Sequence, residues 1–213
     1  MHRIAAILAF CTIATASAQA TLPAQGQRGV EMTSQYGAPD IDLQSILYFE
    51  DIGLEKVKFA GEGLEGGDYM ISIEDYVNGT LSARKTVFDS REDSYFKIRG
   101  NELPFRVLSK TDPGKSVKLE FQFNGFSKRA GFDLLPKEEA FALKSFLGSR
   151  PSVAVDLEAE NVVLTYMMPY VAGDGSTQYC EVVQSDIAPE QLGKKYGIPR
   201  YFLVKIRFFP AKA

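Results

Sequence analysis

The fold of this chain is indicated most clearly by one stretch, Val117-Lys118-Leu119-Glu120-Phe121-Gln122-Phe123. Apolar and polar residues alternate along it, and a β-strand points successive side chains to opposite faces of a sheet. The alternation therefore predicts a strand with one apolar and one hydrophilic face. Outward from this stretch, short segments of the same kind recur along the chain, so we expect strands to dominate the fold.

A β-hairpin is predicted on the N-terminal side of that strand. Its two strands would be residues 70–77 and 80–88, which flank Asn78-Gly79. This dipeptide tolerates the positive φ angles that a type I′ turn requires at both central positions. Further strands are expected at residues 56–60, 95–99, 105–109, 162–167, 178–184 and 201–209.

Two short helices are predicted in the connections between strands. Residues 136–147 begin with Pro136 and stop before Gly148, and residues 189–196 begin with Pro189 and stop before Gly197. Proline at the start and glycine just past the end are typical of helices. A parallel α/β sheet would need helices between most strands. We therefore expect a mainly β fold, an antiparallel β-sandwich of immunoglobulin-like or Greek-key type.

The first residues have the three parts of a secretory signal peptide, which we assign to residues 1–18. Arg3 gives a positive start, residues 4–15 are apolar, and Ala16-Ser17-Ala18 provides small residues for cleavage. Residues 19–44 are rich in Gln, Gly, Pro and Thr, which predicts a flexible leader. Residues 45–213 would form a single β-sandwich domain, with a subdivision near 133–151 as an alternative. The expected location is the periplasm or the cell surface.

Histidine is nearly absent, which excludes whole classes of chemistry. His2 is the only histidine, and it lies in the predicted signal peptide. A mature chain without histidine has no Ser/His/Asp or Cys/His relay and no histidine-ligated metal site. Of the two cysteines only Cys180 would remain, so we expect no disulfide within the chain, and the role of Cys180 stays open. The formal net charge of −3 does not favour nucleic acid as a partner.

Two motif matches are better explained by structure than by chemistry. Residues 61–66, Gly-Glu-Gly-Leu-Glu-Gly, fit a dinucleotide-binding pattern, but a strand is predicted where that mechanism needs a helix N-terminus. Ser82 and Lys85, like Ser94 and Lys97, have the Ser-x-x-Lys spacing of penicillin-recognising enzymes. In those enzymes a helix places both side chains on one face, whereas here both pairs fall in predicted strands. Neither motif therefore predicts a cofactor or a nucleophile.

Acidic residues are the remaining candidates for a metal or catalytic site. Oxygen ligands from loops at one end of a sandwich could hold calcium, although no stretch has the Asp-x-Asp-x-Asp-Gly pattern of a calcium loop. Two facing carboxylates could also hydrolyse a glycosidic bond without histidine. The candidate acids are Asp40, Asp42, Glu50, Asp51, Glu74, Asp75, Glu92, Asp93 and Asp174.

Aromatic residues near the C-terminus indicate a binding surface. Tyrosine offers a large contact area with few rotatable bonds, and all ten tyrosines lie beyond the predicted signal peptide. An exposed tyrosine patch is expected around Met167-Met168-Pro169-Tyr170. The candidate binding residues are Tyr166, Met168, Tyr170 and Asp174.

Three segments carry a resemblance to known sequences: residues 87–93 (Val-Phe-Asp-Ser-Arg-Glu-Asp), 179–183 (Tyr-Cys-Glu-Val-Val) and 198–203 (Ile-Pro-Arg-Tyr-Phe-Leu). With them the chain resembles an uncharacterised family of small secreted proteins of gut-type Gram-negative bacteria, over most of the mature chain. The resemblance implies secretion. It implies no reaction and no site residues, because the family carries no assigned activity.

These features together predict a secreted, non-enzymatic module that binds a protein or glycan at the cell surface. A small outer-membrane β-barrel is one alternative, because the chain length and the aromatic last strand suit it. A carboxylate-based hydrolase acting on glycans is another. No transmembrane helix is expected, since no apolar run of sufficient length follows the signal peptide. The identity of the ligand and the oligomeric state do not follow from the sequence.

Overall fold

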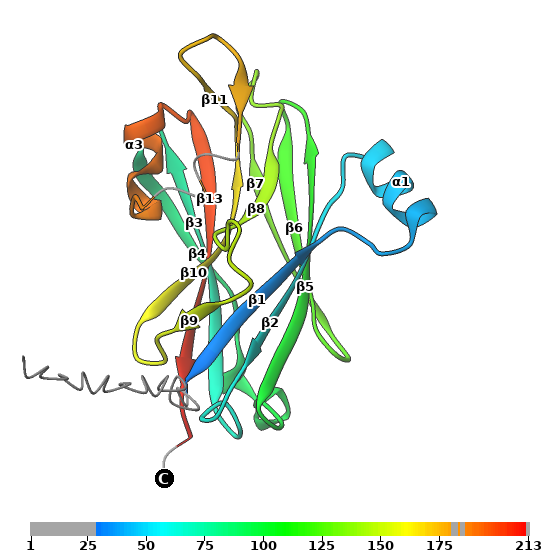
Figure 1. The fold of residues 1–213 in the computed structure, drawn as a ribbon, viewed down its shortest axis with the longest axis vertical. Coiled ribbons are helices and arrows are strands. Elements are labelled where there is room, and N and C mark those ends of the chain that lie inside the picture. The colour runs from blue at the N-terminus through cyan, green and yellow to red at the C-terminus, as the bar shows by residue number, and fades with distance from the viewer. Residues whose placement is uncertain (1–28, 180–182, 184–185, 212–213) are drawn as a thin grey trace, which may run out of the picture.

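Two antiparallel β-sheets pack face to face in the computed structural model, which describes residues 29–179, 183 and 186–211 (Figure 1). Sheet A has six strands. In spatial order they are β7 (Ser127–Asp133), β6 (Ser116–Gln122), β5 (Glu102–Asp112), β2 (Gly53–Ala60), β1 (Val30–Tyr36) and β9 (Val153–Val155). Sheet B has five strands. In spatial order they are β4 (Thr80–Asp89), β3 (Asp68–Val77), β13 (Arg200–Phe209), β10 (Glu160–Met167) and β8 (Ala142–Ser145). The predicted antiparallel β-sandwich is confirmed.

Short elements connect or extend the strands. A small hairpin pairs β11 (Tyr170–Val171) with β12 (Thr177–Gln178). Among the residues that the structure describes, the 3-10 turns are η1 (Ser90–Glu92), η2 (Ser94–Phe96) and η3 (Pro189–Gln191), and the fully described helices are α1 (Ile41–Phe49) and α3 (Leu192–Tyr196). Across the described ranges, no helix is long and apolar enough to span a bilayer.

The stretch that best indicated the fold forms β6, and its alternation is confirmed. Val117, Leu119 and Phe121 are fully buried between the sheets, whereas Lys118 on the opposite face is exposed. The predicted hairpin is confirmed as β3 and β4, which pair antiparallel. Its turn has φ angles of 50° at Asn78 and 73° at Gly79, as a type I′ turn requires. Residues 61–66 form a turn between β2 and β3, with no helix after them.

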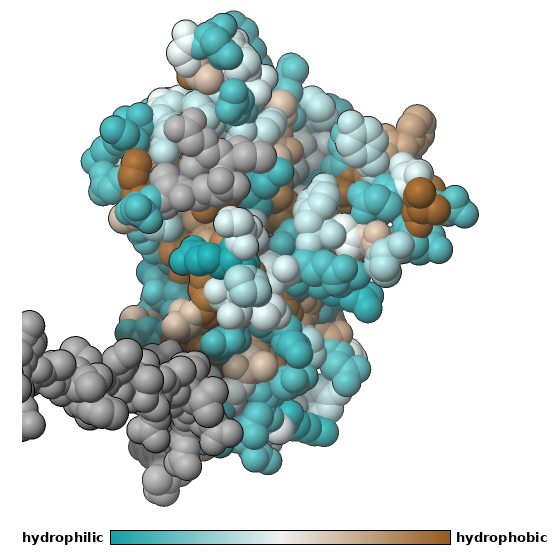
Figure 2. Space-filling model, in the orientation of Figure 1, coloured by the Kyte–Doolittle hydropathy of each residue, from teal (hydrophilic) through white to brown (hydrophobic). Residues whose placement is uncertain are grey.

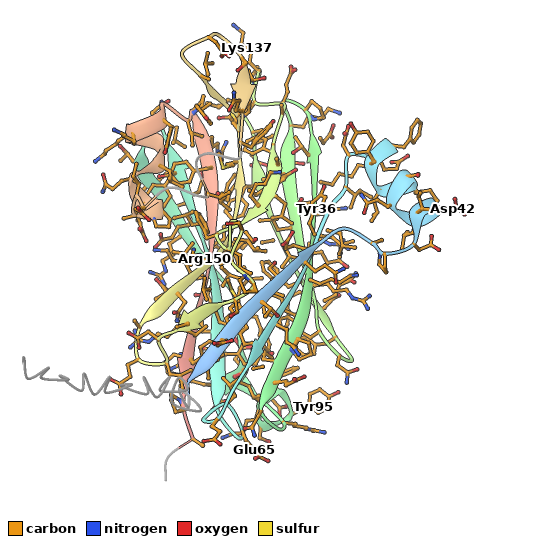
Figure 3. All side chains as sticks on the ribbon, viewed as in Figure 1. Tyr36, Asp42, Glu65, Tyr95, Lys137 and Arg150 are labelled. Atoms are coloured by element: carbon orange, nitrogen blue, oxygen red, sulfur yellow. The ribbon has the colours of Figure 1, made fainter. Side chains whose placement is uncertain are left out.

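One large hydrophobic cluster fills the space between the two sheets. Figure 3 labels Tyr95 at one end of the sandwich, and the part of the cluster beside it is rich in phenylalanine. The Phe126 ring centroid lies 4.6 Å from that of Phe123, 4.8 Å from that of Phe96 and 5.0 Å from that of Phe88. The cluster also includes Leu143 and Leu147, so residues from the stretch 133–151 share the same core.

The prediction of a helix at residues 136–147 is wrong. The chain turns at Lys137, where φ is 81°, and residues 142–145 form β8, which pairs antiparallel with β10 at the edge of sheet B. The Glu138 carboxylate accepts a hydrogen bond from the Leu135 backbone N–H (2.8 Å) and pairs with Arg200 (2.7 Å). Pro136 and Glu138 therefore belong to a turn and not to the start of a helix. Glu138 caps this turn and compensates the buried Arg200.

The predicted flexible leader is wrong for residues 30–44. Val30–Tyr36 forms β1, which pairs with β2 and β9, and α1 begins at Ile41. Val30 and Met32 are 1% and 2% exposed, so this strand contributes to the core with few apolar residues. The polar composition of this segment is the reason why β1 was not predicted from the sequence. Residues 1–28, which include the predicted signal peptide, lie outside the described residues.

Two of the predicted strands also differ in the structure. Residues 95–99 are not a strand: η2 covers their first two residues, and Phe96 packs edge-on against Phe88 in the core. Of residues 178–184, Gln178 belongs to β12. Residues 180–182 and 184, with Cys180 among them, lie outside the described residues.

A second, smaller hydrophobic cluster covers the outer face of sheet B. The predicted helix at residues 189–196 is confirmed as η3 followed by α3, and it ends at Gly197 in the left-handed conformation. Leu192 is fully buried, and a Cβ atom on Gly193 would lie only 2.6 Å from the Gly79 Cα atom. Glycine at both positions therefore lets α3 sit directly on the turn of the β3–β4 hairpin.

Candidate functional site

Helix α1 projects from sheet A (Figure 1), and most of its apolar side chains are exposed. Ile41, Tyr48 and Phe49 are 78%, 81% and 84% exposed, and brown side chains mark this helix in Figure 2. Leu47 is its only buried residue. Single exposed apolar residues are common, but a contiguous group is typical of an interaction surface.

Local interactions define where α1 begins and ends. The Asp40 carboxylate accepts a hydrogen bond from the Leu43 backbone N–H at 2.8 Å, which is an N-cap, and Asp42 lies in the first turn. The helix ends before Asp51, whose φ of 53° is left-handed. The apolar residues of α1 do not form one stripe at helical spacing, so its sequence has no amphipathic pattern that would predict a helix.

A cleft of about 620 Å³ lies between α1, the end of β5 and the edge strand β8. We call it the α1 cleft. Its aromatic lining comes from both sheets and from α1, and consists of Tyr36, Tyr48, Phe49, Phe141, Tyr166 and Tyr179. Figure 3 shows Tyr36 at the junction of β1 with the α1 connection. The cleft and the exposed face of α1 therefore form a continuous surface.

The inner end of the α1 cleft is lined by hydroxyl groups. Along β5, the inward positions change from buried apolar residues to Ser109 and Thr111, and Tyr166 faces them from β10. The Tyr166 hydroxyl lies 2.6 Å from Thr111 Oγ1. Burial raises the pKa of Tyr166, while the neighbouring Thr111 and Ser109 hydroxyls oppose that rise. Ser109 is 1% exposed, and its hydroxyl faces Tyr166 in the buried inner end of the cleft, without a well-formed hydrogen bond within the described ranges.

Charged groups surround the cleft. Lys110 donates to Glu50 at 2.8 Å, which lowers the pKa of that carboxyl. The Lys144 ammonium lies 6.0 Å from the ring centroids of both Tyr36 and Tyr179. Behind this rim Glu55 is 3% exposed, and its pKa is raised because burial outweighs its hydrogen bond with Ser34 and the nearby Lys144.

The four predicted binding residues do not lie together on an exposed surface. Tyr166 and Tyr170 are only 2% and 4% exposed, so an exposed tyrosine patch is not seen at these positions. Met168 is half-buried, and Asp174 is exposed in the turn of the β11–β12 hairpin, where it accepts from the Ser176 backbone N–H at 2.9 Å. Of the four, Tyr166 lines the α1 cleft. Whether any of them binds a ligand stays a prediction.

The candidate acids are scattered over separate parts of the fold. Asp40, Asp42, Glu50 and Asp51 lie in or beside α1, and Glu92 and Asp93 lie in the 3-10 turns. Glu74 and Asp75 are neighbours on β3, so they point to opposite faces of sheet B. Within residues 29–179, 183 and 186–211, no group of three or more His, Cys, Asp or Glu side chains is arranged to hold a metal ion.

The densest charge cluster lies on the outer face of sheet B beneath η3. Lys205 is buried there, and its ammonium lies 2.8 Å from Glu74 Oε2 and 2.7 Å from Glu190 Oε1. Burial alone would lower the pKa of Lys205, but these two carboxylates raise it. Arg84 pairs with Glu74 and with Glu160. Each carboxylate is thus compensated by a cation, which indicates a structural role.

A second buried ion cluster lies inside the sandwich. Arg200 pairs with Asp75 at 2.8 Å and with Glu138 at 2.7 Å.

The alternating pattern of β13 predicts that Lys205 points away from the core, as it does. It could not predict that Lys205 is buried, because the covering acid Glu190 is separated from it by a turn and a helix.

Comparison of the chain with family models, with curated proteins and with solved structures gave no match. The resemblance to a family of secreted proteins therefore stays a prediction. The function must be argued from the geometry of the chain itself.

Proposed function

We propose that the protein is a non-enzymatic binding module whose ligand occupies the α1 cleft and covers the exposed face of α1. The observation that carries this proposal is the exposure of Tyr48 and Phe49, 81% and 84%, at the border of an aromatic cleft. Export to the periplasm or cell surface, as predicted from residues 1–18, is part of the same proposal.

The energetics support a binding surface at α1. Burying a large apolar side chain contributes about 1.5–3 kcal/mol. Aromatic side chains are enriched at the centre of interfaces, where they act as anchors for the partner. The Thr111 hydroxyl in the α1 cleft adds a hydrogen-bonding group that can orient a ligand.

The alternative of a carboxylate-based hydrolase is less well supported by the same site. A glycosidase needs a carboxylic acid with a raised pKa as its proton donor. At the α1 cleft, Glu50 has the opposite property, because Lys110 lowers its pKa. Glu55 does have a raised pKa, but it is buried behind the rim and bonded to Ser34. The site thus favours recognition over acid catalysis.

Ligand selection with random-peptide phage and a panel of neutral oligosaccharides tests this proposal. We expect selected ligands to bind the full chain and to lose at least tenfold in affinity with Tyr48→Ser or Phe49→Ser. Leu81→Ser is the matched control, because Leu81 is an exposed apolar residue, 48% exposed, on β4. Equal binding by all three variants would place the site elsewhere. Turnover of an oligosaccharide would identify an enzyme instead.

A further inference from the structure

A row of polar side chains crosses the outer face of sheet A. In the strand register Gln35 lies opposite Lys56, Lys56 opposite Arg106, and Arg106 opposite Gln122. These residues come from β1, β2, β5 and β6, four neighbouring strands (Figure 1). The buried neighbours of these residues point into the sandwich, so the row faces outward.

The centre of this row places two cations opposite each other without compensation. Like charges that lie directly opposite on neighbouring strands destabilise a sheet. In the part of the chain that the structure describes, neither the Lys56 nor the Arg106 side chain forms an ion pair or a hydrogen bond, although their backbones pair in the sheet. Nearby cations do: Lys58 pairs with Glu102 at 3.1 Å, and Arg129 pairs with Glu120. The arrangement leaves two positive charges available to an anion.

The two cations line a hollow of about 620 Å³, which shares no lining residue with the α1 cleft. Amide and hydroxyl groups surround the two cations, from Thr33, Gln35, Gln122 and Asn124. Such groups both donate and accept hydrogen bonds, so they suit the hydroxyl groups of a sugar. A guanidinium group suits a carboxylate, because it can donate two parallel hydrogen bonds to the two carboxylate oxygens.

We propose that this hollow is a second binding site, which takes an anionic oligosaccharide such as a polymer of uronic acids. Lys56 and Arg106 bind its carboxylates, and Gln35 and Gln122 bind its hydroxyl groups. An acidic peptide fits less well, because it lacks the hydroxyl groups that the amide side chains suit. β2, β5 and β6 are paired on both sides and offer no edge for β-strand addition, whereas β1 is paired with β9 only over residues 30–32. The formal net charge of the chain is −3, so attraction of a polyanion must be local. The site is independent of the α1 cleft.

Titration of the full chain with oligogalacturonate at low ionic strength tests the proposal. We expect saturable binding, loss of at least tenfold in affinity with Lys56→Gln or with Arg106→Gln, and no binding of the fully methyl-esterified, neutral oligomer. Lys118→Gln is the matched control, because Lys118 is an exposed lysine of the same sheet, opposite Lys110 and outside the hollow. This variant should bind like the unchanged protein.

Three results would overturn the proposal. The first is an absence of binding at low ionic strength. The second is an equal loss with Lys118→Gln, which would show general attraction by surface charge. The third is equal or tighter binding of a polyglutamate peptide, which would identify the ligand as an acidic peptide. Phe49→Ser should leave oligogalacturonate binding unchanged, so failure here and failure at the α1 cleft are distinguishable.

Discussion

Helices α1 and α3 lie outside the sandwich, and their apolar residues have opposite environments. In α3, Leu192 is fully buried against the outer face of sheet B, where it joins Tyr201 and Leu203 in a second core. In α1, Leu47 is buried, whereas Ile41 and Phe49 are 78% and 84% exposed. One helix therefore completes the fold, and the other presents a surface. We infer that α3 contributes to stability and α1 to recognition.

The ion pairs beside the two helices differ in the same way. Next to α3, Lys205 and Glu74 have side chains that are only 8% and 6% exposed. Next to α1, Lys110 and Glu50 are 41% and 47% exposed. Solvent screens the second pair far more than the first. The comparison can thus be tested with charges as well as with apolar residues.

The largest effect is expected from Lys205→Met. It removes the buried ammonium from Glu74, which keeps only the half-exposed Arg84 as a cation. Removing one member of a buried ion pair costs about 3–5 kcal/mol, and the remaining pair with Arg84 places the expected loss toward the lower end. Lys110→Met, the same change beside α1, should change the free energy of unfolding far less, because its ion pair with Glu50 is exposed and screened by solvent. Urea denaturation measures both free energies of unfolding. If both variants lost the same free energy of unfolding, the ion pair beside α3 would be no more buried in solution than the ion pair beside α1.

The next effect is expected from Leu192→Ala. The substitution opens a cavity in the second core, which costs about 2–5 kcal/mol for a buried leucine. Leu43→Ala is its counterpart on α1; Leu43 is 47% exposed, so its loss should change the free energy of unfolding by less than about 0.5 kcal/mol. Thermal unfolding of both variants is the measurement. A Leu43→Ala variant as unstable as Leu192→Ala would mean that α1 is packed in solution.

A pH-dependent effect is expected at Glu55, which lies behind α1 on β2. Its pKa is raised above the value in the unfolded chain because burial disfavours the carboxylate. The folded state therefore binds the proton more tightly, and stability falls as the pH rises from 4.5, the ordinary value, through the raised pKa. Glu55→Gln should remove this loss, so it should stabilise the protein at pH 7. At pH 3, where both states are protonated, we expect little difference. A Glu55→Gln variant less stable than the unchanged protein at pH 7 would contradict this.

Local pattern explains why some of these elements were predictable. β6 has a strict alternation, the β3–β4 hairpin has Asn78-Gly79, and α3 ends at Gly197, so each is determined by residues close in sequence. The position of Lys205 on the outer face of β13 also follows from alternation. The sandwich is predictable because short patterned segments of this kind build most of it.

Distant contacts explain what was missed. Residues 136–147 have helical end signals, yet Glu138 pairs with Arg200, 62 residues away, and the following residues complete the edge of sheet B. α1 is defined by a cap at Asp40 and one buried residue, which no periodic pattern reveals. The hollow on sheet A depends on the register that places Lys56 opposite Arg106, and β3 and β4 separate these strands in sequence.

The smallest effect on stability is expected from Phe49→Ser, and it separates the two helices most sharply. The ring is 84% exposed, so its removal should change the free energy of unfolding by no more than about 0.5 kcal/mol. It should nevertheless lower the fluorescence of bis-ANS, a dye that binds exposed apolar surface. The control Leu81→Ser removes a less exposed apolar side chain, outside the α1 cleft, and should change the fluorescence less. If Phe49→Ser instead destabilised the protein as strongly as Leu192→Ala, the ring would be packed against the rest of the molecule. The exposed face of α1 would then be part of the fold, and recognition would have to be sought elsewhere.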